Sequence, residues 1–296
     1  MQPATPLKAW FFSPSLSPDG QKIAYTTLGK EPRAWVYDLR RETATRLTGD
    51  GKPWSIIWTP DGKRVVFDWG QFDNHRLIYW QPADGSSPME RLPTSDTNQG
   101  VGSFSPDGAT LAFEGPLHEA NWHIYLLDMR RRLETPLVSP SQDSAATYDG
   151  DPRFSPDGRW LAYWSNESGR REVYLRPFPG PGGKWQISSE GGLSPLWARN
   201  GKQLFYRRED ASGQQVWAVD VQGGPAFNPG KPRLLFNLHK VRAEGGEQHG
   251  CWDISLDGQR FLMVKLEERE SRPLTEMILV QNWFDELKRL APSGEK

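Results

Sequence analysis

Ser17-Pro18-Asp19-Gly20 is the motif that sets the architecture, because the chain repeats it, whole or in part, along most of its length. Further copies stand at 59–62, 105–108, 155–158, 198–201 and 255–258. Proline presets the second position of a type I turn, and glycine supplies the positive φ that lets two strands pair across it. All six copies keep an Asx-Gly pair, and successive pairs are 42 to 57 residues apart. The repeat predicts six tight hairpin turns.

Short apolar segments flank every turn, as expected for buried strands. A large apolar residue stands three positions before each Asx: Leu16, Trp58, Phe104, Phe154, Trp197 and Ile254. Two apolar runs and a more polar one follow each turn; in the first unit they cover 23–25, 35–37 and 45–47. Four strands per unit, with no helix between them, are typical of a β-propeller.

We therefore expect one all-β domain over residues 1–296, a six-bladed β-propeller with four-stranded antiparallel blades. The blades are assigned to 10–48, 49–93, 94–139, 140–189, 190–237 and 238–281. Residues 1–9 are expected to add the outer strand of the last blade, which closes the ring and removes exposed strand edges. Asn282 is expected to cap a short helix, so 282–296 form a C-terminal helix and tail.

The composition argues against several classes of partner. The 296 residues contain 36 Lys and Arg against 37 Asp and Glu, so no surface for nucleic acid is expected. A single cysteine, Cys251, excludes an internal disulfide framework and a zinc finger. The apolar segments near both ends are too short to span a bilayer, so we expect no direct membrane insertion.

The direction of the strands predicts where a ligand site lies. The loops between second and third strands share one rim with the blade-to-blade connections, and the Asx-Gly turns lie on the opposite rim. Polar groups that converge at the mouth of a propeller channel are the default ligand site. We expect that site on the first rim, at Trp54, Gln99, Asp149, Asp151, His249, His75, His118, Trp122 and Trp164.

Structural roles compete with functional roles at each candidate. His249 beside Cys251, with Asp149 and Asp151, has residue types that serve in metal or acid-base sites. Solvated side chains, or side chains bonded to loop backbone, explain them more simply. We expect no metal and no cofactor; a divalent cation, if bound, would lie near Asp149, Asp151 or His249.

The remaining candidates carry weaker signals. His75, His118 and His123 are spread over two units, without the spacing of metal ligands. Trp58 and Trp197 stand at a core position of the repeat. Trp54, Trp122 and Trp164 are expected on the rim, where an exposed ring meets a partner or packs in a loop.

With these repeats, the chain resembles the TolB-like six-bladed β-propellers, which are built from WD-repeat-like Pro-Asp-Gly units, over nearly its whole length. The segments 176–188 and 281–290 also resemble the C-terminal propellers of bacterial multidomain sensor and serine/threonine kinase proteins. That resemblance implies a propeller preceded by another domain, often across a membrane span. It favours an extracytoplasmic position, with the cytoplasm as the alternative.

We expect a non-catalytic sensor or interaction module of a larger bacterial protein, which binds a ligand or protein over the channel rim. The resemblance favours a protein or peptide partner over a small molecule, and we expect a monomer. The alternative is a lyase or hydrolase with a polar, metal-assisted site in the channel mouth. A third interpretation is an accessory propeller that controls access to a separate catalytic domain. The sequence contains no Gly-x-Ser-x-Gly nucleophile motif.

Overall fold

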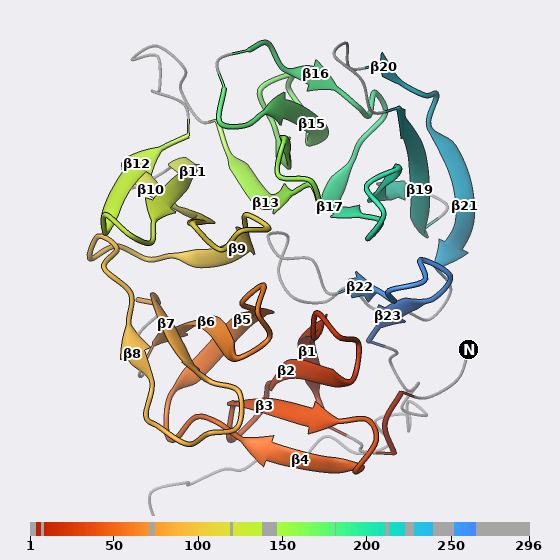
Figure 1. Ribbon diagram of the computed structural model, residues 1–296. Helices are drawn as coiled ribbons and strands as arrows, with labels where there is room; N and C mark the ends of the chain where they lie inside the picture. Colours follow the sequence, from red (N-terminus) through yellow and green to blue (C-terminus); the bar gives the residue numbers. More distant parts are fainter. Residues whose placement is uncertain are drawn as a thin grey trace, which may run out of the picture. The chain divides into compact units, whose positions relative to one another are not determined.

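The computed structural model describes residues 4–6, 9–70, 75–118, 121–137, 147–180, 182–210, 213–222, 228–238 and 252–264. Over this part the chain forms six antiparallel sheets, arranged around a common axis (Figure 1). None of these residues belongs to a helix that is long and apolar enough to cross a membrane.

Four sheets contain four strands each. The first has β1 (Phe11–Leu16), β2 (Lys22–Thr27), β3 (Arg33–Asp38) and β4 (Thr43–Arg46). The second has β5 (Lys52–Trp58), β6 (Arg64–Gly70), β7 (Leu77–Pro82) and β8 (Glu90–Arg91). The third has β9 (Gly100–Phe104), β10 (Thr110–His118), β11 (Asn121–Asp128) and β12 (Leu133–Pro136). The fourth has β13 (Asp149–Phe154), β14 (Trp160–Ser165), β15 (Glu172–Pro177) and β16 (Trp185–Gln186).

Two further sheets continue the ring. The fifth has β17 (Leu193–Trp197), β18 (Gln203–Asp210), β19 (Gly213–Gln222), β20 (Asn228–Pro229) and β21 (Arg233–Leu238), and both β20 and β21 pair with β19. The sixth has β22 (Trp252–Ile254) and β23 (Phe261–Met263). The first strand of each sheet lies nearest the axis (Figure 1). Along the chain, β1, β5, β9, β13 and β17 contact one another in turn, and β22 contacts β1.

The predicted fold class, an all-β propeller of antiparallel meanders, is confirmed. Five sheets have four or more strands, whereas the sixth shows two among the described residues. The sixth predicted blade, 238–281, is described only over 252–264. Of the predicted closing strand at 1–9, the described residues 4–6 and 9 are in no strand, and the others lie outside the described residues. The predicted C-terminal helix and tail, 282–296, also lie outside them.

The hairpin turns have the geometry that their sequence predicts. The six turn glycines, Gly20, Gly62, Gly108, Gly158, Gly201 and Gly258, have φ between 67° and 73°. In the first turn, the Gly20 N–H donates to the Ser17 carbonyl at 2.8 Å. The Ser17 hydroxyl donates to Asp19 Oδ1 at 2.5 Å and accepts the Lys22 N–H at 2.9 Å. The turn therefore satisfies its own polar groups where two strands reverse.

The hydrophobic core lies between neighbouring sheets rather than inside any one of them. Each of six apolar clusters joins residues of two adjacent sheets, and the last joins Leu262 of β23 to Ile23 and Tyr25 of β2. Trp58 and Trp197 are buried, which confirms their predicted core position. A sheet of this size cannot cover both its faces by itself, so each blade depends on its neighbours.

Candidate binding site at the channel mouth

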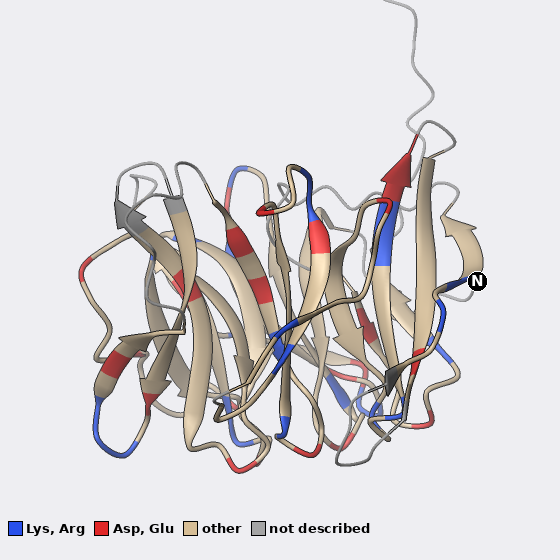
Figure 2. Cartoon of the chain, turned by 90° about the horizontal axis from the view of Figure 1, so that it is seen from above, with Lys and Arg blue, Asp and Glu red and all other residues tan. Residues whose placement is uncertain are grey.

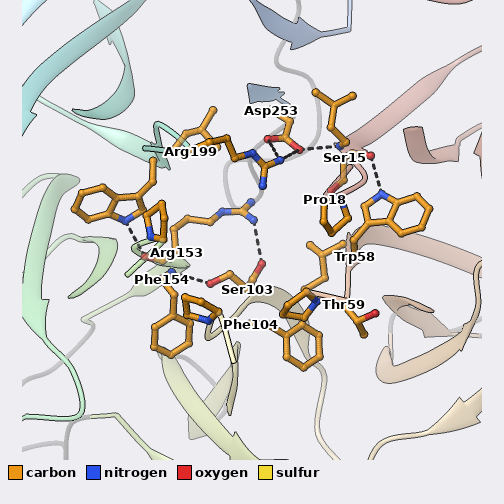
Figure 3. Close-up of a pocket in the computed structure, with 18 of the residues that line it drawn as sticks. Ser15, Pro18, Trp58, Thr59, Ser103, Phe104, Arg153, Phe154, Arg199 and Asp253 are labelled. Atoms are coloured by element: carbon orange, nitrogen blue, oxygen red, sulfur yellow. Dashed lines mark hydrogen bonds and ion pairs between the residues drawn. The ribbon is translucent and has the colours of Figure 1, made fainter. Parts of the chain in front are cut away.

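A cavity of about 330 Å³ lies where the inner strands meet the Asx-Gly turns (Figure 3). It receives one residue from each sheet at the position four before the Asx: Ser15, Ile57, Ser103, Arg153, Leu196 and Asp253. In five sheets it also receives the residue directly before the Asx: Pro18, Pro60, Pro106, Pro156 and Arg199. The cavity therefore belongs to the rim that carries the turns, which is the lower edge in Figure 2.

β-Bulges direct the first set of residues into the cavity. The register of β13 against β14 shifts between Gly150 and Arg153, and Asp151 has a φ of 52°. Ser13 and Ser194 have the same left-handed backbone at the equivalent positions, and a proline follows all three. A bulge interrupts strand alternation and re-aims the next side chain. Arg153 thus turns toward the channel although a regular strand would place it otherwise.

Arg153 is held in place from three directions. Its Nη1 donates to the Gly102 carbonyl at 3.0 Å, and its Nη2 lies 3.6 Å from Asp151 Oδ1. Its own carbonyl accepts the indole N–H of Trp197 at 3.1 Å. The bonds to β9 and β17 anchor this arginine to both adjacent blades. Its guanidinium therefore reaches the cavity in one preferred orientation.

Arg199 and Asp253 form a longer ion pair on the other side of the cavity. Arg199 Nη2 lies 3.4 Å from Asp253 Oδ1 and 3.5 Å from Oδ2. Both carboxylate oxygens also accept backbone bonds at 2.7 Å, Oδ2 from the Leu16 N–H and Oδ1 from the Ile254 N–H. Charge-assisted bonds are normally 2.7–2.9 Å long, so the arginine makes the weaker contact.

Aromatic rings and prolines form much of the remaining cavity wall, together with several hydroxyl side chains. Trp58, Phe104, Phe154, Trp197 and Trp252 contribute to it together with the turn prolines. The Ser103 hydroxyl accepts the Phe154 N–H at 2.9 Å, and so ties β9 to β13. A concave, mostly apolar site with a few convergent polar groups is the usual form of a ligand pocket.

Of the nine residues selected from the sequence, those whose side chains the structure describes do not line this cavity. Trp54 is half-buried against Phe12, at 4.9 Å between ring centroids, with the Arg76 guanidinium 5.3 Å from its own centroid. Gln99 is fully buried and bonds the 94–95 segment, accepting from Thr94 Oγ1 at 2.7 Å. His75 is exposed, with Nε2 3.9 Å from Asp96. These three residues have local structural contacts.

The structure brings some of the other candidates together on the opposite rim. Asp149 Oδ2 lies 3.1 Å from Nδ1 of His123, which joins β13 to β11. Asp151 donates its N–H to Glu114 Oε2 at 3.1 Å. Trp164 is 2 % exposed, so the expectation of an exposed ring is wrong there, because the ring packs in the blade with Arg171 5.1 Å from its centroid.

The last three candidates are described in part or not at all. Trp122 is half-buried in β11, opposite Pro116 of β10. His118 lies at the end of β10. His249, like Cys251, lies outside the described residues. Over the described part of the chain, no group of three or more His, Cys, Asp and Glu side chains is placed to hold a metal ion.

Burial and the negative charge of Asp149 together affect the pKa of Tyr163. Burial raises the pKa of the Tyr163 phenol, and the negative charge of Asp149 adds to the effect. Tyr163 therefore stays protonated at neutral pH, and its hydroxyl remains neutral beside the pair.

Sequence reasoning missed Arg153, Arg199 and Asp253, although the repeat carries a signal for each. The turn position filled by proline in four copies is Arg199 in the fifth. The position four before the Asx is small or aliphatic in four copies and charged at Arg153 and Asp253. Where a residue that faces the axis differs from the other copies of the repeat, its side chain is a candidate for a role other than forming the turn.

Comparison with known proteins places the fold. No family model matches the chain. It is 28% identical over 271 residues to an uncharacterized protein of Agrobacterium fabrum, covering 86% of this chain and 84% of that protein. It is 27% identical over 228 residues to Dipeptidyl-peptidase 5 of Aspergillus fumigatus, covering 67% of this chain but 31% of that protein. The second match thus spans less than a third of its partner.

Solved structures give the same fold. A protein from Agrobacterium tumefaciens assigned as TolB has a TM-score of 0.69 at 22% identity, covering 86% of this chain and 91% of that one. TolB from Acinetobacter baumannii has a TM-score of 0.60 at 20% identity, covering 76% and 57%. Oligogalacturonate lyase from Vibrio parahaemolyticus has a TM-score of 0.55 at 14% identity, covering 85% and 69%. The chain is a β-propeller with TolB structures among its neighbours.

Proposed function

We propose that the protein is a non-catalytic binding propeller that receives a segment of a protein partner at the cavity on the Asx-Gly rim. The observation that carries this proposal is the convergence of residues from all six sheets on one cavity, whose described lining combines aromatic rings and prolines with three charged side chains. A volume of about 330 Å³ suits a few residues of an extended segment rather than a folded domain. The resemblance to TolB-like propellers favours a protein partner.

We also propose that the propeller works as an interaction module within a longer chain. The match to Dipeptidyl-peptidase 5 supports this, because it covers 31% of that protein. The resemblance to sensor and serine/threonine kinase propellers points the same way. In such an arrangement the cavity binds the partner and another domain responds.

Selection of random peptides displayed on phage tests the binding role. The selected peptides are measured against the wild-type protein and a Ser15→Trp variant by fluorescence anisotropy. Ser15 lines the cavity, and only its carbonyl, through the Trp58 indole, takes part in a described bond there. The larger side chain fills the cavity, so affinity should fall by about tenfold or more, roughly 1.4 kcal/mol of binding free energy.

A Trp54→Ala variant is the matched control on the opposite rim. It should bind the selected peptides as the wild type does, because Trp54 does not line the cavity. Peptides that bind the Ser15→Trp variant as tightly as the wild type would contradict a binding site on the Asx-Gly rim. Peptides that lose affinity only for the Trp54→Ala variant would instead place the binding site on the rim that was predicted from the sequence.

One observation favours a second candidate, a hydrolase or lyase. His123 and Asp149 form a partly buried pair with the carboxylate on Nδ1, an arrangement that orients an imidazole for proton transfer at Nε2. Dipeptidyl-peptidase 5 and oligogalacturonate lyase stand among the similar proteins. The purified protein is assayed on aminoacyl-nitroanilides and on oligogalacturonate. Turnover that a His123→Gln variant loses would establish this candidate; equal turnover by the variant would reject it.

A further inference from the structure

We infer that the channel mouth recognises a carboxylate of the bound peptide, which is held between the guanidinium groups of Arg153 and Arg199. This inference rests on the proposed function and specifies the chemistry of the same site. Both side chains line the cavity and extend into its middle from the same side (Figure 3). Two like charges that converge repel each other, and an anion between them relieves that repulsion.

Arg199 has donors to offer. Its Nη2 makes only the long contacts to Asp253, and over the described residues its Nη1 and Nε donate to no group. Its side chain is 35 % exposed, so it can adjust to an incoming ligand. A planar guanidinium binds a carboxylate with two parallel bonds, which are shorter and stronger than the bonds seen here. A ligand carboxylate is therefore a better acceptor for Arg199 than Asp253.

Arg153 supplies a second, fixed cation. Its bond to Gly102 and its contact with Asp151 hold the guanidinium before any ligand arrives. Asp151 is buried behind it and does not line the cavity. A pre-positioned donor loses little conformational freedom on binding. Arg153 therefore orients the carboxylate, and Arg199 closes on it.

Asp253 is the only negative charge among the lining residues that the structure describes, and the backbone already uses both its oxygens. It stays in place when Arg199 turns toward the ligand, because the bonds from Leu16 and Ile254 are the short ones. Proline and aromatic side chains lie beside the arginines in the cavity wall, and partly apolar surroundings strengthen an ion pair. A carboxylate is therefore the kind of charged group that the mouth is suited to bind.

Fluorescence anisotropy with defined peptides tests the inference. The probes are labelled hexaglutamate with an amidated end, hexaglutamine with a free C-terminal carboxylate, and hexaglutamine with an amidated end. We expect at least one carboxylate-bearing probe to bind the wild type, and the last probe not to bind. Binding of hexaglutamate amide assigns a side-chain carboxylate, and binding of the free-ended hexaglutamine assigns a terminal one.

Arg199→Gln should weaken the binding probe by about tenfold or more, since one charged partner is lost. Arg46→Gln is the matched control, because Arg46 is exposed on the outer strand β4, outside the cavity. An equal loss for both variants would show diffuse charge attraction and overturn the inference. Thermal melts of both variants confirm that they are folded.

Failure of this inference is distinguishable from failure of the proposed function. If no carboxylate probe binds, or if Arg199→Gln binds it normally, the carboxylate is wrong. Selected phage peptides that still lose affinity for Ser15→Trp would then keep the binding role at the cavity. If those peptides also ignore Ser15→Trp, the site itself is rejected.

Discussion

Single tryptophans connect adjacent blades through both packing and a hydrogen bond. The Trp58 indole N–H donates to the Ser15 carbonyl at 3.0 Å, and Trp197 and Trp252 make the same contact with the preceding blade at 3.1 Å. All three are buried. The ring fills the space between two sheets, and the N–H donates to a backbone carbonyl of the preceding blade.

Replacement of Trp58 by alanine should therefore lower the free energy of unfolding by about 3–5 kcal/mol. The loss combines the apolar area of a buried ring with the hydrogen bond from its indole N–H to the Ser15 carbonyl. Chemical denaturation monitored by fluorescence gives the value. Leu133→Ala is the control, because Leu133 is 53% exposed and its removal should change stability by less than about 0.5 kcal/mol. A similar loss in both variants would contradict the structural role of Trp58.

At the scale of the element, the Asx-Gly turn also responds to pH. A hydrogen bond from the Ser17 hydroxyl, and then one from the Gln21 N–H, lower the pKa of Asp19 from its ordinary value of 3.8. Asp61, Asp107 and Asp257 are lowered in the same way, each first by the hydroxyl two residues before it. The unfolded chain lacks these bonds, so the folded state binds protons less tightly.

When folding lowers the pKa of a carboxyl group, that group stabilises the folded state at pH values above its pKa in the unfolded chain. This stabilisation is lost as the pH falls through the pKa of the group in the folded protein. We expect the free energy of unfolding to decrease below about pH 4 partly for this reason. A variant with Asp19, Asp61, Asp107 and Asp257 all changed to Asn should decrease less steeply. Asn200 already fills this position in the fifth turn, where its Oδ1 accepts the Lys202 N–H at 2.9 Å. Urea denaturation at several pH values gives the free energy of unfolding of the wild type and the variant. The same dependence of this free energy on pH in both proteins would refute the explanation.

At the scale of the whole molecule, contacts between the first and sixth sheets complete the ring of described blades. Asp253 of β22 accepts the Leu16 N–H of β1 at 2.7 Å. Leu262 of β23 packs on the apolar cluster of the first sheet. These two residues link segments that are far apart in the sequence, so they hold the ring together without any help from local structure.

Asp253→Ala should lower the free energy of unfolding by about 2–3 kcal/mol, because it leaves the buried Ile254 N–H and the Leu16 N–H without an acceptor. Asp220→Ala is the matched control, since Asp220 is exposed and bonds only surface groups such as Gln203. The control should lose less than about 1 kcal/mol. Equal losses in urea denaturation would show that Asp253 does not close the ring.

The amino-acid sequence alone predicts the turns, the order of the strands and the core positions of Trp58 and Trp197. Each follows from interactions within a few residues, such as the positive φ of Gly20 or the hydroxyl of Ser17 in its own turn. Those signals repeat six times, so the propeller could be predicted without any knowledge of distant contacts.

Only the tertiary structure decided which side chains meet at the mouth of the channel. Bulges at positions such as Asp151 interrupt the alternation of the inner strands, and a shift by one residue exchanges the two faces of a strand. Arg153, Arg199 and Asp253 belong to three successive blades and come together only when the sheets are arranged around one axis. The candidate site therefore lies on the opposite rim from the one that strand direction predicted, because its geometry depends on non-local packing.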